Sequence, residues 1–265
     1  MPLTFAHPAA AIPLLRPLGR FGSLSALIIG SIAPDMSFFV PIGVTREQTH
    51  GLAALFLFCL PVGLLTYLLF HGVLKAPLRA LLPNPIAARI PSAAARIAAR
   101  SLTDWLAVLV SILCGAMSHV AWDAFTHPGT AVVNAIAWLQ TPLAHVGGYQ
   151  LFGYKLLQHG GTVVGLGLLA TWTLRWVART EPASVFETTL RLRTRCLILI
   201  SIAGFSIAAG VMAVHLRDAP GSDAIKVQAL VAAFVFAALP ALTLALTVYS
   251  LLWQITQRSA LASSR

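Results

Sequence analysis

The sequence contains few charged residues and few cysteines. Charged side chains make up 10% of the 265 residues, compared with roughly 25% in a soluble domain. So little charge could not cover the surface of a water-soluble enzyme, and the composition also excludes a disordered chain and a coiled coil. The three cysteines, Cys59, Cys114 and Cys196, lie in or beside apolar runs, which argues against a disulfide framework and against paired-cysteine metal sites.

Apolar residues are abundant instead, and they gather in long runs. They make up 58% of the chain, and the mean hydropathy is +0.82. A helix needs about 20 residues to cross the hydrocarbon core of a bilayer. We therefore predict an all-α, polytopic membrane protein with about six transmembrane helices, at residues 21–40, 51–74, 102–125, 161–177, 196–216 and 227–255. The shorter apolar stretch 131–146 is expected to lie at the membrane interface.

Basic residues predict the orientation of these helices. Lys and Arg concentrate in two connections, residues 75–100 and 175–195. Because loops rich in Lys and Arg tend to stay in the cytoplasm, we predict that both loops and both termini are cytoplasmic. The two loops contain little aromatic sequence, so anionic lipid headgroups are their expected partners and nucleic acid is not.

Ionisable residues occur where the predicted helices should be apolar. Such residues are costly inside a membrane, and by default they suggest a function. On the predicted topology they gather near the outer face, and they are Asp35, His50, His119, Asp123, His127 and His159.

The densest group lies within residues 118–129. His119 and Asp123 are four positions apart, so they share one face of a helix, and together they can reach one metal ion. His127 lies a further turn along and can join them if the helix persists to Pro128. The alternative is a satisfied polar pair, in which Asp123 fixes the tautomer of His119 and nothing binds.

Two further motifs are Thr49-His50 and Ala33-Pro34-Asp35. Pro34 disfavours a helical Ala33, so the chain is expected to turn within the membrane and to present Asp35. A lone Asp at such a place would ordinarily cap a helix. Three motifs on one side of the membrane together favour a metal site, with a divalent ion, zinc first, as the cofactor.

Together with an N-terminal Phe-Ala-His-Pro, these motifs resemble a known family. In order and spacing they are similar to the uncharacterised bacterial membrane proteins of domain of unknown function 4184. The motifs that carry the resemblance are at residues 5–8, 30–35, 49–51, 118–127 and 154–160. The resemblance implies a family-like membrane domain at residues 1–180, located in the bacterial inner membrane. Residues 181–265 would add two transmembrane helices and a cytoplasmic tail.

A more distant resemblance is to inner-membrane metal-dependent hydrolases. It rests on a His near the start, a Pro-Asp, a Thr-His and a Ser-His-x-x-x-Asp. It implies hydrolysis at a divalent metal ion, and it carries over to His7, Asp35, His50, His119 and Asp123. Ser37 stands where those proteins often have a second Asp, which argues against a two-metal site.

The position of His7 depends on the path of the N-terminal segment. Arg16 and Arg20 place the start of the first predicted helix inside, whereas the other site residues are predicted near the outer face. The nine residues from His7 to Arg16 span about 14 Å as a helix, half of a core about 30 Å thick. His7 therefore joins the site only through a re-entrant N-terminal helix. The alternative is an interfacial helix with His7 at the membrane surface.

The leading hypothesis is a metal-dependent hydrolase of a membrane lipid or another membrane-facing ester. His50, His119 and Asp123 would hold the ion, and Asp35 would be a further ligand or a base, so Asp35 and Asp123 are the expected catalytic carboxylates. His7, His127 and His159 complete the expected metal-binding set. The rival hypotheses are a transporter or proton-relay protein and a non-catalytic membrane scaffold. Two other histidines are expected to play no part: His71, predicted to be interfacial, and His215. His145 lies in the predicted outer loop and can join the site only if that loop folds over it.

Overall fold

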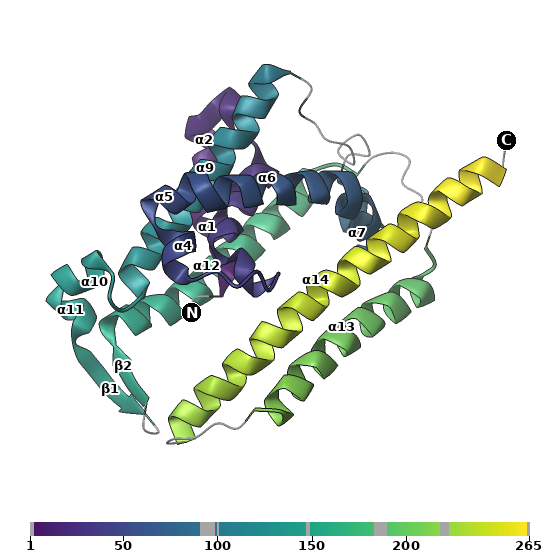
Figure 1. Cartoon of the computed structure of the whole chain (residues 1–265). Coiled ribbons are helices and arrows are strands. Elements are labelled where there is room, and N and C mark those ends of the chain that lie inside the picture. Colours follow the sequence, from purple (N-terminus) through teal and green to yellow (C-terminus); the bar gives the residue numbers. More distant parts are fainter. Residues whose placement is uncertain are drawn as a thin grey trace.

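The structure is a computed structural model, and it describes residues 3–90, 99, 101–146, 149–182, 190–217 and 223–263. It is almost entirely helical (Figure 1). The chain starts with five one-turn helices: η1 (Thr4–Ala6), α1 (Pro8–Ala11), η2 (Ile12–Leu14), α2 (Leu15–Leu18) and η3 (Gly19–Phe21). Prolines at positions 8, 13 and 17 break this segment, because proline has no N–H to continue a helical ladder.

Five helices of the described chain are long and apolar enough to cross a membrane, so the predicted count of six is not confirmed. They are Leu52–Leu81, Leu102–Ala135, Gly153–Arg179, Leu192–His215 and Lys226–Gln257. The first predicted span, residues 21–40, is the shorter apolar helix Leu24–Phe38. It consists of α3 (Leu24–Ile32) and the 3-10 helix η4 (Ala33–Phe38).

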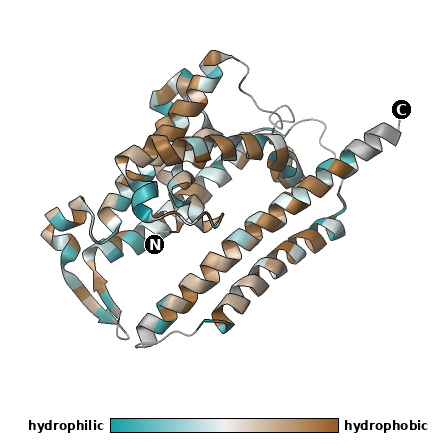
Figure 2. Cartoon of the chain, viewed as in Figure 1, coloured by the Kyte–Doolittle hydropathy of each residue, from teal (hydrophilic) through white to brown (hydrophobic). Residues whose placement is uncertain are grey.

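The outside of these helices is strongly apolar. Figure 2 shows apolar residues along most of α13 (Leu192–His215) and α14 (Asp223–Ser263). Large apolar side chains are exposed on every long helix, for example Leu57 at 81% and Leu192 at 73%. Because a soluble monomer rarely exposes so much contiguous apolar surface, the long apolar helices indicate a membrane protein.

The first of the long helices, Leu52–Leu81, contains two π-helical segments, each shortly before a proline. It runs through α5 (Leu52–Ala54), η5 (Leu55–Cys59), α6 (Leu60–Leu69), η6 (Phe70–Leu74) and α7 (Lys75–Leu81), and a short α8 (Asn84–Ala87) follows. The segments η5 and η6 are π-helical and precede Pro61 and Pro77. A π turn makes room for the proline ring, which would otherwise crowd the carbonyl four residues earlier.

Helix α9 (Leu102–Thr126) is the central helix, and both of its ends are set by local sequence. Ser101 and Asp104 form a reciprocal capping box at its start. The helix stops at Thr126 because Pro128 disfavours a helical His127, which is extended at φ −122° and ψ 136°.

Helix α3 crosses α9 with the two backbones in direct contact. A Cβ atom at Gly30 would overlap the carbonyl oxygen of Ile112, and one at Gly115 would overlap that of Leu27. Only glycine allows so close a crossing, as in other membrane helix pairs. The crossing brings the carbonyl group of Ser31 against α9.

A β-hairpin interrupts the otherwise helical chain, so the all-α prediction holds only in outline. After α10 (Ala131–Ala135) and α11 (Ala137–Gln140), strands β1 (Pro142–Val146) and β2 (Tyr149–Phe152) pair antiparallel, with Ala144 opposite Leu151. The hairpin leads directly into α12 (Gly153–Arg179).

Helices α13 and α14 form an antiparallel pair on one side of the molecule (Figure 1). Polar side chains join this pair to the chain around α7. Tyr249 donates a hydrogen bond to the carbonyl of Pro77 at 3.1 Å, and Gln254 donates to that of Val73 at 3.3 Å. Pro77 has no N–H to serve the Val73 carbonyl, so Gln254 supplies the missing donor.

Candidate metal site

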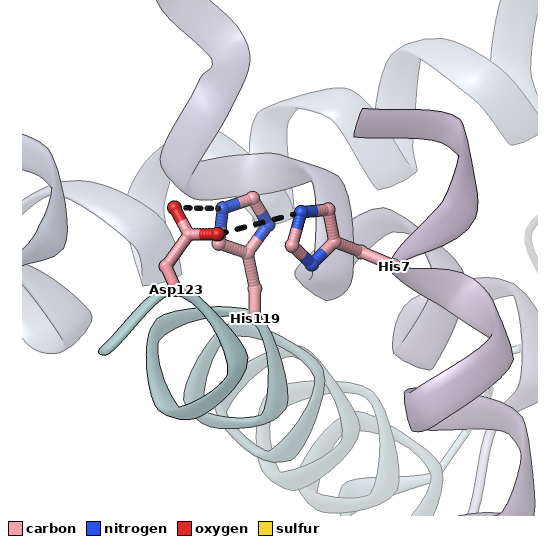
Figure 3. A group of neighbouring side chains, drawn as sticks. All are labelled: His7, His119 and Asp123. Atoms are coloured by element: carbon pink, nitrogen blue, oxygen red, sulfur yellow. Dashed lines mark ion pairs between the residues drawn. The ribbon is translucent and has the colours of Figure 1, made fainter. Parts of the chain in front are cut away.

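Five polar side chains from separate parts of the chain meet in one buried cluster. They form two overlapping groups that share His119, and the candidate ligand atoms of each group lie within 4.8 Å of one another. One group is His7, His119 and Asp123, and the other is Asp35, His50 and His119. Figure 3 shows His7 reaching from the N-terminal segment towards His119 and Asp123 on α9.

His119 and Asp123 share one face of α9, as their spacing predicts. The Nδ1 atom of His119 lies 2.7 Å from the carbonyl oxygen of Ser31. A carbonyl only accepts, so Nδ1 carries the proton and Nε2 keeps a free lone pair. That Nε2 lies 3.5 Å from Asp123 Oδ2 and 3.8 Å from Asp35 Oδ2. Metal-ligating histidines are commonly oriented in this way.

His50 presents its ring in the same manner from the last residue of α4 (Arg46–His50). The hydroxyl of Thr49 donates to the carbonyl of Arg46 at 3.2 Å, so its oxygen accepts from His50 Nδ1 at 2.7 Å. The other nitrogen, Nε2, lies 3.5 Å from Asp35 Oδ1 and 3.4 Å from Asp123 Oδ2. Burial disfavours the charged ring, but the carboxylates of Asp123 and Asp35 outweigh it and raise the pKa of His50.

Asp35 enters the cluster from η4, and the sequence-based reason for its position was wrong. The chain does not turn away from helix at Ala33, which has φ −54° and ψ −40°. Instead α3 tightens into a 3-10 helix, where Pro34 occupies the first turn and its missing N–H is not needed. Asp35 is 3% exposed and accepts a 2.6 Å hydrogen bond from Thr4 Oγ1.

His7 reaches the cluster from the N-terminal chain of short helices. It is 4% exposed, its ring stacks on that of His119 with centroids 3.7 Å apart, and its Nε2 lies 3.7 Å from Asp123 Oδ1. Burial, and then the adjacent His119 ring, lower the pKa of His7 to about 4, so the ring is neutral at neutral pH. Thr4 contacts Asp35 from the same segment, so this segment contributes to the site twice.

Arg46 is the residue that the sequence interpretation missed. Its Nη2 donates to Asp123 Oδ2 at 2.7 Å, and its side chain is 36% exposed. It lies four residues before His50 on α4, the spacing that places two side chains on one helical face. That spacing was the available signal, and it places a cation at the exposed edge of the cluster.

His127 and His159, both predicted ligands, are placed differently. His127 Nδ1 lies 3.4 Å from Asp123 Oδ2. Its Nε2 accepts from Gln158 Nε2 at 3.4 Å, and Lys155 Nζ donates to Gln158 Oε1 at 2.9 Å. His127 therefore lies beside Asp123 but outside the two groups. His159 is exposed and belongs to neither group, because the buried face of α12 carries Gln158.

The remaining histidines of the described chain lie elsewhere. His71, predicted to be interfacial, is buried within the protein, 3.0 Å from Ser25 Oγ and in ring contact with Tyr67. His145 is on the exposed β1 strand. His215 is exposed and contacts the carbonyl of Val211.

The cluster has the chemistry of a metal site. Within the part of the chain that the structure describes, six of its buried polar atoms have no hydrogen-bond partner: His7 Nδ1 and Nε2, Asp35 Oδ1, His50 Nε2, His119 Nε2 and Asp123 Oδ1. Each such atom ordinarily costs about 1–3 kcal/mol. The nitrogen–oxygen separations of 3.4–3.5 Å around His50 and His119 exceed a good hydrogen bond. They match the spacing of about 3.4 Å between tetrahedral ligands of one zinc-sized ion.

Fold and cluster together define a helical membrane protein with a buried His/Asp group that could hold a metal ion. The chain belongs to the family described as Domain of unknown function (DUF4184), which matches residues 1–251. The match continues well past residue 180, to which the sequence resemblance extends, so α13 and most of α14 are part of the family. No curated protein and no solved structure matches the chain, and the more distant hydrolase resemblance gains no support from these comparisons.

Proposed function

We propose that this protein binds a divalent metal ion in the buried cluster and uses it to hydrolyse a lipid or another membrane-facing ester. The observation that carries the proposal is the set of unpaired, buried nitrogen and oxygen atoms that converge there. His50, His119 and Asp123 would hold the ion, with His7 as a further ligand. His159 has no role in this proposal, because it is exposed.

The nature of the donor atoms favours zinc. Imidazole nitrogens with a carboxylate oxygen are its usual ligands at catalytic sites, where one position stays open for water or substrate. When bound, zinc supplies a nucleophile at neutral pH by lowering the pKa of a water towards roughly 7. The charge of the site is compatible with a cation, because among the described residues the two buried carboxylates pair with a single fixed cation, Arg46.

The side chains around the ion then have distinct tasks. Asp35 Oδ1 is buried and unpaired, whereas Asp35 Oδ2 is held by Thr4, so Oδ1 is free to accept the proton of the attacking water. The water oxygen bonds to the acyl carbon or phosphorus, and the ester bond to the alcohol oxygen breaks. The proton held at Asp35 then passes to that departing oxygen.

We further propose that the site faces the outer side of the bacterial inner membrane, with both termini cytoplasmic. The distribution of basic residues supports this orientation. The same basic connections would contact anionic lipid headgroups.

A second candidate function is proton or cation translocation, and one observation favours it. Lys155, Gln158, His127 and Asp123 form a continuous line of polar contacts from a half-buried lysine to the cluster. Chains of Asp, Glu and His inside membranes carry protons in pumps and transporters, and here Gln158 would hold Lys155 and His127 in line.

Hydrolysis of a chromogenic ester by the purified protein in lipid nanodiscs tests the leading proposal. We expect cleavage of p-nitrophenyl carboxylic or phosphodiester probes that a chelator abolishes and zinc restores. Asp35→Asn should retain the ion but lose the activity, whereas His159→Ala should retain both. Metal-loaded protein that cleaves neither probe but transports protons in proteoliposomes would contradict the hydrolase and support the second candidate.

A further inference from the structure

An apolar pocket opens beside the metal site, and His7 lines both. The pocket has a volume of about 200 Å³. Its walls come from the N-terminal segment and from α12, with Trp122 of α9 between them. Apart from His7 and Trp122, the pocket is lined by small or aliphatic residues, which include Ala9, Ala10, Gly161, Val164, Gly165 and Leu168.

His7 is the polar end of this pocket. Its side chain is buried, both ring nitrogens lack a hydrogen-bond partner among the described residues, and Nε2 lies 3.7 Å from Asp123 Oδ1. Trp122 is the residue before Asp123, so the aromatic wall of the pocket and a carboxylate of the cluster share one turn of α9. The apolar space therefore ends at the metal site.

Small residues make the space available. A Cβ atom at Gly161 would meet the ring of Trp122, and one at Gly165 would meet Ala6 at 3.0–3.1 Å. Helix α12 therefore lies close against Trp122 of α9 at Gly161 and against the N-terminal segment at Gly165. Beside the contact, alanines on the N-terminal side leave room that larger side chains would fill.

The outer edge of the pocket continues into the apolar surface of the molecule. On α12, Val164 is 60% exposed and Leu168 is 57% exposed, and Val163 beside them is 73% exposed. Helix α12 is one of the five helices long and apolar enough to cross a membrane. A molecule in the hydrocarbon layer could thus enter the pocket from the side, without passing through water.

We infer that this pocket binds a segment of the acyl chain of a membrane lipid and so presents the lipid's ester group to the cluster at His7. The presentation of the ester group rests on the proposed hydrolytic function. Binding of the acyl chain in the pocket does not require that function. An acyl segment matches the apolar walls, whereas a polar ligand would leave its own groups unpaired there.

Photolabelling in nanodiscs tests the inference. Phosphatidylcholine carrying a diazirine in its acyl chain is mixed into nanodiscs with the full-length protein, irradiated, and the adducts are located by peptide mass spectrometry. We expect labelling of residues 6–10 and 161–168 several-fold above that of α13, a more apolar helix that does not line this pocket. Ala9→Leu should fill the space and reduce labelling of both segments several-fold, leaving α13 unchanged.

The chain offers a matched control on α12, the helix that lines the pocket opposite the N-terminal segment. Gly167→Leu adds the same side chain to α12 at a position with nothing within 4 Å of a Cβ atom, so labelling should stay as in the parent. If Ala9→Leu fails to fold, Ala10→Phe, from an exposed lining position, replaces it.

Metal content, measured on the same samples, separates this inference from the proposed function. Pocket labelling that Ala9→Leu reduces, in protein that holds no metal, would support the acyl site and contradict the hydrolase. Bound metal with uniform labelling of α12 and α13, or labelling that Ala9→Leu leaves unchanged, would overturn the acyl site alone.

Discussion

The Nδ1 atom of His119 lies 2.7 Å from the carbonyl oxygen of Ser31, a residue 88 positions earlier in the chain. This one contact fixes the tautomer of the histidine that both groups of the cluster share. It exists because α3 and α9 touch at Gly30 and Gly115. The helix crossing therefore determines which ring nitrogen faces the carboxylates.

A larger residue at the crossing of α3 and α9 should weaken metal binding although it does not contact the metal ligands. We expect Gly115→Val to lower the free energy of unfolding by about 1–3 kcal/mol through overpacking, and to weaken metal binding by moving Ser31 away from His119. Thermal unfolding in detergent and metal content measure the two effects. Gly204→Val, at a position with nothing within 4 Å of a Cβ atom, is the control. Unchanged metal binding by Gly115→Val would show that the crossing does not orient His119.

The hydroxyl of Thr49 should matter for metal binding more than for folding. Thr49→Val keeps the shape but removes the acceptor for His50 Nδ1, and losing such an orienting partner typically weakens metal affinity by about 10–100-fold. Zinc titration measures the change. Thr66→Val is the matched control, because the Thr66 hydroxyl donates to the carbonyl of Val62 in its own helix and has no other hydrogen bond among the described residues. Equal affinities for the Thr49 variant and the parent would contradict the assigned tautomer of His50.

Replacing Arg46 should tighten metal binding. The guanidinium pairs with Asp123 Oδ2 at 2.7 Å, so it competes with a metal ion for that oxygen and repels the ion's charge. We expect Arg46→Met to lower the dissociation constant for zinc roughly tenfold, equivalent to about 1.4 kcal/mol, while destabilising the metal-free protein. Isothermal titration and thermal unfolding with and without zinc check both parts. Weaker zinc binding by this variant would show that Arg46 supports the ion instead.

The proposed orientation predicts a labelling pattern in intact cells. In a cysteine-free background, a cysteine at Pro83 or at Pro182, in the two basic connections, should resist a membrane-impermeant maleimide. A cysteine at Leu143, on the exposed β1 strand, should react. Labelling at Pro83 and Pro182 but not at Leu143 would reverse the orientation and place the site on the cytoplasmic side.

The sequence was most informative where the geometry of the site is local. His119 and Asp123 share a face because they are four residues apart on one helix, whereas the helix ends at Thr126 and does not persist to Pro128. Asp35 and His50 were recognised as polar residues inside an apolar segment or at its edge. The contact between these two side chains and α9 depends on long-range packing. The only sequence signal for that contact was the similar predicted depth of the residues in the membrane.

The errors come from packing that no local pattern encodes. On α12 the buried position is Gln158 and not its neighbour His159, because the helix already begins at Gly153 after an unpredicted hairpin. The apolar segment at residues 21–40 predicted one membrane-spanning helix. The part that contains Pro34 is instead a 3-10 helix, so α3 is short.

Metal content of the purified protein tests the central claim most directly. We predict that the parent, purified without chelator, retains about one zinc-class ion per chain by plasma mass spectrometry. His119→Ala and Asp123→Asn should insert and purify normally but lose most of it, because one interhelical hydrogen bond in a membrane contributes only about 0.6 kcal/mol. His159→Ala should keep its metal. A parent without metal even after zinc loading, together with an Asp123→Asn variant that aggregates, would contradict the metal site and identify the cluster as a structural element between helices.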